Sequence, residues 1–87
     1  MRASHILVET LEQAQLLKQQ LNEGADFGDL ARQYSKCPSG HNQGDLGEFG
    51  PGQMVPPFEI AVNSTPVDSV SDPVRTQFGY HLILRTG

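Results

Sequence analysis

Two histidines and one cysteine are the residues of this chain best suited to chemistry. His5 and His81 each lie inside an apolar run near one end of the sequence, Ser4–Val8 and Tyr80–Leu84. Both runs are typical of β-strands, and if the strands pair, the two imidazoles can share one face of a sheet. Neutral imidazoles can hydrogen-bond to each other, one ring as donor and the other as acceptor. A single histidine in a strand is more often structural, so the pair indicates a site only if the rings touch.

Cys37 is the only cysteine, and the residues leave its role open. It could be a thiolate nucleophile activated by His5 or His81, as in cysteine hydrolases, or it could be a buried, inert thiol. A hydrolase also needs an oxyanion hole and an orienting side chain, and the sequence identifies neither. A zinc site made of Cys37, His41, His5 and His81 is arithmetically possible, but the spacing differs from compact zinc signatures and disfavours it.

Several large apolar residues fall in or beside predicted loops and not on helix stripes. They are Leu46, Met54, Phe58 and Phe78. They either fill the core or form the wall of a pocket. The Gly-Asp-Leu-Gly and Gly-Pro-Gly runs lack the strand-to-helix context of a phosphate-binding loop, which argues against nucleotide binding.

The two histidine runs are predicted to be the first and last strands. Alternation along residues 3–8 places His5 on the face opposite Ile6 and Val8, and alternation along residues 80–85 places His81 opposite the more apolar positions 80, 82 and 84. Between these strands, Thr10 and Asp26 are typical N-caps of two helices, and Gly24 favours the end of the first. The predicted buried stripes are Leu11, Ala14, Leu17 and Leu21 in the first helix, and Phe27, Leu30, Ala31 and Tyr34 in the second.

The middle of the chain changes character. Residues 37–52 are rich in glycine and predict a long functional loop with one short strand over residues 45–49. Pro57 is typical of the first turn of a third helix, with Phe58, Ala61 and Val62 directed inward. Residues 66–76 predict a connector and a short strand, which forms a hairpin with residues 80–85. This order predicts one α+β domain over residues 1–87, with a mostly antiparallel sheet and helices packed on it.

Composition narrows the partners and the location. The net charge is −4, and the 6 basic residues are scattered, which argues against nucleic acid and anionic membranes. No run approaches the roughly 18 apolar residues of a membrane helix, and a strand starting almost at Met1 leaves no room for a signal peptide. One cysteine allows no intrachain disulfide. We therefore expect a cytoplasmic protein, and a monomer.

Six runs of the sequence, in order, resemble the parvulin-type peptidyl-prolyl cis/trans isomerases and together cover essentially the whole chain. They are Ser4-His5-Ile6-Leu7-Val8, Asp26-Phe27-Gly28-Asp29-Leu30-Ala31, Cys37-Pro38-Ser39-Gly40, Gly44-Asp45-Leu46-Gly47-Glu48-Phe49, Gly52-Gln53-Met54-Val55-Pro56-Pro57-Phe58-Glu59 and Thr76-Gln77-Phe78-Gly79-Tyr80-His81. The resemblance implies a four-stranded antiparallel sheet surrounded by helices, with the histidines adjacent on neighbouring inner strands.

The resemblance also implies the site residues. His5, Cys37, Thr76 and His81 are expected to form a polar floor, and Leu46, Met54, Phe58 and Phe78 the walls around a substrate proline. The implied activity is rotation about Xaa-Pro bonds of peptides and of unfolded or partly folded proteins, with no cofactor and no metal. An alternative is a binding or chaperone module that uses the same cleft without catalysis. Because none of the expected site positions is replaced, the sequence favours an active enzyme.

Substrate preference is predicted from an absent feature. In the parvulin-type family that this sequence resembles, phosphate-directed members carry a basic cluster in the loop after the first strand. This cluster can pair with a phosphorylated residue before proline. In this chain that loop is short and acidic, Glu9-Thr10-Leu11-Glu12, and no lysine or arginine occurs from Ala3 to Leu17. We expect no preference for phosphorylated peptides, a tolerance for apolar or small residues before proline, and a non-covalent mechanism.

Overall fold

The computed structural model describes residues 1–87, apart from the side chain of residue 39. Its elements follow the predicted order, with one short addition. They are β1 (Arg2–Val8), α1 (Leu11–Asn22), α2 (Phe27–Tyr34), the 3-10 helix η1 (Pro38–Asn42), β2 (Asp45–Glu48), α3 (Pro56–Ser64), β3 (Val74–Thr76) and β4 (Gly79–Arg85). The α+β class is confirmed. The 3-10 helix was not predicted, because its residues, Pro38–Asn42, lie in the glycine-rich segment assigned to loop.

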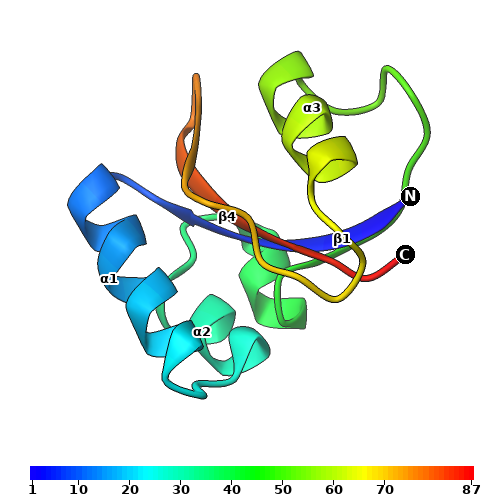
Figure 1. Ribbon diagram of the computed structural model, residues 1–87. Coiled ribbons are helices and arrows are strands. Elements are labelled where there is room, and N and C mark those ends of the chain that lie inside the picture. Colours follow the sequence, from blue (N-terminus) through cyan, green and yellow to red (C-terminus); the bar gives the residue numbers. More distant parts are fainter.

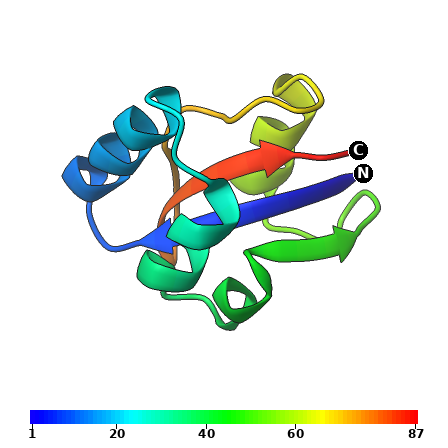
Figure 2. The same cartoon turned by 90° about the horizontal axis from the view of Figure 1, so that it is seen from below.

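A four-stranded antiparallel sheet forms the centre of the molecule, in the order β2-β1-β4-β3. The first and last strands of the chain are therefore the two inner strands, and β3 and β4 form the predicted hairpin. In the register of β1 and β4, His5 lies opposite Ile83 and Leu7 lies opposite His81. Helices α1 and α2 cover one face of the sheet and α3 covers the other, and the chain ends lie side by side (Figures 1 and 2).

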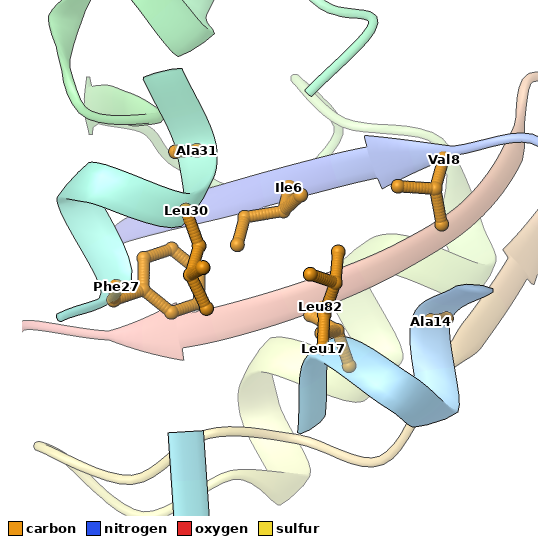
Figure 3. Packing of buried hydrophobic residues seen from close by; sticks show 8 residues of the cluster. All are labelled: Ile6, Val8, Ala14, Leu17, Phe27, Leu30, Ala31 and Leu82. Carbon is orange, nitrogen blue, oxygen red and sulfur yellow. The ribbon is translucent and has the colours of Figure 1, made fainter. Parts of the chain in front are cut away.

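The face under α1 and α2 holds the larger core. Ile6, Val8 and Leu82 of the inner strands are fully buried there. They pack against five side chains of the two helices, Ala14, Leu17, Phe27, Leu30 and Ala31 (Figure 3). Burying one such large side chain stabilises the fold by roughly 1.5–3 kcal/mol, so this cluster anchors both inner strands.

The opposite face, under α3, is also apolar. Ala3 and Ile83 pack there against Phe49, and against Phe58 and Val62 of α3. The predicted alternation holds, since His5 and His81 lie on this second face and the large core lies on the first. Rigid packing on both faces of the inner strands holds the two histidine backbones in place.

Both predicted N-caps are confirmed. Thr10 Oγ1 accepts a hydrogen bond from the Gln13 N–H at 3.1 Å, and Asp26 Oδ2 accepts one from the Asp29 N–H at 3.0 Å. The predicted burial of Leu11 and Tyr34 in the helix stripes is wrong, because both side chains are exposed. Each is the terminal residue of its helix, so it has a flanking turn on one side only and lacks the cover that the middle residues have.

Candidate active site

The two histidine rings touch. His5 Nδ1 and His81 Nδ1 lie 2.9 Å apart, and the rings are stacked with centroids 5.1 Å apart and planes inclined by 15°. Only 5% of His5 and 4% of His81 is exposed. A contact between two nitrogens at this distance requires that one of them carries the proton and the other accepts it.

Thr76 extends this contact into a chain. Its Oγ1 lies 2.7 Å from His81 Nε2 and accepts a hydrogen bond from the Phe78 N–H at 3.2 Å. The Thr76 hydroxyl carries one proton, which it can donate to His81 Nε2. In that arrangement His81 carries its proton on Nδ1 and donates it to His5 Nδ1. This order gives each of these atoms one complementary role and fixes both ring orientations.

Burial keeps the histidine pair uncharged. It lowers the pKa of His5 from 6.5 to about 4, with a second contribution from the neighbouring His81. Burial also lowers the pKa of His81. A charged imidazole loses its hydration in such a place, so the neutral form is favoured at neutral pH.

Cys37 is placed by the segment that follows α2. Ser35 Oγ accepts hydrogen bonds from the Leu7 N–H at 3.1 Å and from the Cys37 N–H at 3.3 Å. The Lys36 N–H donates to the Leu7 carbonyl oxygen at 2.8 Å. These three bonds tie residues 35–37 to the end of β1, so the half-buried Cys37 is held beside the strand that carries His5.

An apolar cavity of about 430 Å³ opens above the histidine pair. Its lining includes every predicted site residue except Thr76, namely His5, Cys37, Leu46, Met54, Phe58, Phe78 and His81. Thr76 is buried and lies behind His81, so it acts on the ring and does not line the cavity. The structure thus places Thr76, a predicted floor residue, in one hydrogen-bonded chain with His81 and His5, where it positions His81.

Phe58 and Phe78 line this cavity at different depths. The Phe58 ring stands edge-on to both imidazoles, with centroids 5.6 Å from His5 and 5.3 Å from His81. It is buried, so it forms the deep wall. Phe78, in contrast, is 61% exposed and lies at the rim. An exposed aromatic ring beside an apolar cavity is available to pack against a ligand.

Five residues of the lining were missed by the sequence analysis. They are Leu7, Lys36, Pro38, Gln53 and Val55. The signals were present, because Leu7 shares the alternation of His5 and the other four are sequence neighbours of Cys37 or Met54. The loop that carries Met54 is held by side chains: Gln53 Oε1 accepts from the Gly50 N–H at 2.6 Å, and Glu59 Oε2 of α3 accepts from the Gly52 N–H at 3.1 Å.

The geometry bears on the alternatives. His81 engages both ring nitrogens, Nδ1 with His5 and Nε2 with Thr76, so it does not serve as the base of a cysteine nucleophile. His41 lies in η1, is exposed and is absent from the cavity lining. Among the described side chains, no group of three His, Cys, Asp or Glu residues is placed to hold a metal ion. No helix of the described residues combines the length and apolar character needed to cross a membrane.

Known proteins share this sequence and this fold. The family model described as rotamase, PPIC-type PPIase domain, matches residues 5–87. The foldase protein PrsA of a Geobacillus species (strain WCH70) is 54% identical over 83 residues, which cover 94% of this chain and 30% of that protein. The chain thus spans about a third or less of the length of the first curated relatives that it matches.

Solved structures agree. The peptidylprolyl isomerase PrsA from Bacillus anthracis has a TM-score of 0.99 and 43% identity, covering 100% of this chain and 41% of that one. The parvulin NmPin of Nitrosopumilus maritimus has a TM-score of 0.90 and 41% identity, covering 100% of this chain and 95% of that one. With a family match over nearly the whole chain and the same fold, this chain belongs to the PPIC-type PPIase family and is a parvulin-type peptidyl-prolyl cis/trans isomerase domain.

Proposed function

We propose that this domain accelerates rotation about Xaa-Pro bonds in peptides and in unfolded or partly folded proteins, without a covalent intermediate. The observation that carries the proposal is an apolar cavity whose floor is a neutral, hydrogen-bonded histidine pair. Relatives that are named foldases support a role in protein folding.

The cavity suits the transition state of this rotation. Resonance in the amide imposes a barrier of roughly 18–20 kcal/mol, and the twisted amide loses that resonance together with its charge separation. Water therefore solvates the planar amide better than the twisted one, and an apolar cavity reverses this advantage. Each ~1.4 kcal/mol gained gives about tenfold in rate. We assign the prolyl ring to the space between Met54, Phe58 and Phe78, which line the cavity.

The polar residues complete the proposal by holding the cavity in shape. Thr76 orients His81, and His81 orients His5. Because Nδ1 of each ring is committed to the other ring, the pair supports the floor and does not shuttle protons to a substrate. We assign to Cys37 an electrostatic role beside the carbonyl of the residue before proline.

The Cys37 role has a direct test. No bond breaks during rotation, so a thiol nucleophile is unnecessary. Cys37→Ser and Cys37→Asp are therefore expected to retain measurable activity in a protease-coupled or NMR assay. Loss of all activity in a variant with an unchanged circular dichroism spectrum and melting temperature would contradict the non-covalent mechanism.

NMR exchange spectroscopy on a short Xaa-Pro peptide tests the function itself. We expect faster cis/trans exchange on adding the protein, with no new species. Phe78→Ala, at the rim, should weaken this effect, whereas Ile60→Ala, which is 66% exposed on α3 and absent from the cavity lining, is the matched control. Binding without faster exchange would favour a chaperone module, and a cleaved peptide would favour a hydrolase.

The preference, partners and location predicted from the sequence are part of this proposal. The short acidic loop of residues 9–12 supports a site that is not phosphate-directed. A phospho-Ser-Pro peptide turned over faster than its Glu-Pro counterpart would refute this preference. The absence of nucleic-acid and membrane partners, the monomeric state and the cytoplasmic location stay predictions. Sedimentation analysis tests the monomer, and fractionation of the producing cells tests the location.

A further inference from the structure

One charged side chain interrupts the otherwise uncharged lining of the cavity. Lys36 is the only Lys, Arg, Asp or Glu among the residues described as lining it. Its side chain is 57% exposed, and Nζ lies 3.8 Å from Glu9 Oε1. Lys36 thus lies at the rim, with its ammonium group partly offset by one exposed carboxylate.

The backbone of Lys36 is fixed relative to the floor. Its N–H bonds to the Leu7 carbonyl oxygen at 2.8 Å, and its neighbour Cys37 lines the same cavity. A residue that precedes a bound proline lies only about 2.9 Å (cis) to about 3.8 Å (trans) away from it, measured between Cα atoms. If proline fills the space bounded by Phe58 and Phe78, the side chain of the preceding residue is within reach of the part of the lining formed by Lys36 and Cys37.

We propose that Lys36 reads the residue before proline and favours an acidic side chain there over a basic one. This inference rests on the proposed isomerase function and refines the expected tolerance for apolar or small residues. It is consistent with a site that is not phosphate-directed, because one lysine paired with Glu9 differs from a basic cluster.

The pairing with Glu9 sets the size of the effect. An ion pair between two exposed side chains is weak, so a carboxylate of the substrate can compete with Glu9 for Lys36. A lysine or arginine before proline meets the ammonium group without gain. We expect a Glu-Pro peptide to be turned over roughly threefold faster than a Lys-Pro peptide, at low ionic strength.

The test is kcat/KM for Ala-Xaa-Pro-Phe peptides with Glu, Gln or Lys before proline. The Glu to Lys ratio should fall to about one in Lys36→Gln, invert in Lys36→Glu and widen in Glu9→Gln. Arg32→Gln is the matched control, since Arg32 is also half-exposed and paired with a carboxylate, Asp29, but is absent from the cavity lining. Its ratio should equal that of the wild type.

The outcomes separate this inference from the proposed function. Acceleration of the Gln peptide with a ratio that does not respond to Lys36 overturns the role of Lys36 and leaves the isomerase intact. A ratio that changes equally in Arg32→Gln also overturns it, because the effect would then come from net charge. No acceleration of any peptide by the wild type refutes the isomerase function itself.

Discussion

Acidification should destabilise this domain through its buried histidine pair. In the folded state the pKa of His5 is about 4, against 6.5 for an unperturbed histidine. Between these values the unfolded chain binds a proton at this residue and the folded chain does not. Stability therefore rises with pH through this window, is fully present above 6.5 and is lost as the pH falls toward 4.

The magnitude follows from the two values. Protonation of His5 alone is expected to lower the free energy of unfolding by roughly 1 kcal/mol at pH 5.5 and by roughly 2–3 kcal/mol at pH 4.5, relative to pH 8. The lowered pKa of His81 acts in the same direction. The pKa of Asp45 is also lowered, mainly by its hydrogen bond to Arg2, but that contribution is lost only below the ordinary value of 3.8. For a small domain the histidine loss is a large part of the total stability, which is about 5–15 kcal/mol.

Urea unfolding at pH 8, 6.5, 5.5 and 4.5 measures the effect. His5→Asn keeps a side-chain amide that can bond to His81 but does not titrate, so its free energy of unfolding should decline less over this range. His41→Gln is the control, because His41 is exposed, and its decline should match the wild type. A wild-type free energy of unfolding that stays constant from pH 6.5 to 4.5, or an equal decline in His5→Asn, would refute the reasoning.

Two further predictions concern packing. Phe58→Ala removes a buried ring that contacts both histidines, so we expect the free energy of unfolding in urea to fall by about 3–5 kcal/mol and isomerase activity to be lost. Phe58→Leu should recover much of the stability. A Phe58→Ala variant with unchanged stability and activity would contradict the deep-wall role. Gly44→Ala places a Cβ 2.3 Å from the His5 carbonyl oxygen at φ +79°, whereas Gly24→Ala has φ +104° but open space around the new Cβ. The Gly24 variant therefore bears only the conformational strain of about 1–3 kcal/mol, and the Gly44 variant should lose more stability. Equal melting temperatures for the two variants would show that the clash is relieved.

The strands and helices of this fold were predictable because local signals agree with the tertiary structure. Alternation along β1 and β4 correctly separated the face of His5 and His81 from the larger core. The caps Thr10 and Asp26 correctly marked the helix starts. Such agreement between local preference and tertiary packing is expected of a natural sequence whose native contacts support one another.

The details of the site were harder to predict because they depend on contacts between distant segments. Lys36 joins the cavity wall because its N–H bonds to the carbonyl oxygen of Leu7, a residue at the end of β1 that lies 29 positions earlier in the chain. The prediction of substrate preference considered only cations in the loop after the first strand, so it did not include Lys36. Thr76 was identified through the family resemblance, but only the structure shows that it lies behind His81 and not at the cavity surface.

The arrangement links stability to catalysis in one place. Two buried polar rings are costly unless their nitrogens find partners, and here Thr76 and the two imidazoles supply partners to three of the four ring nitrogens. These bonds run between the two rings and toward the buried Thr76, and the lining of the cavity above them is mainly apolar, as the twisted amide requires. In the proposed mechanism, the histidines therefore serve the reaction by remaining neutral and fixed, and the walls formed by Phe58, Met54 and Phe78 act directly on the prolyl ring.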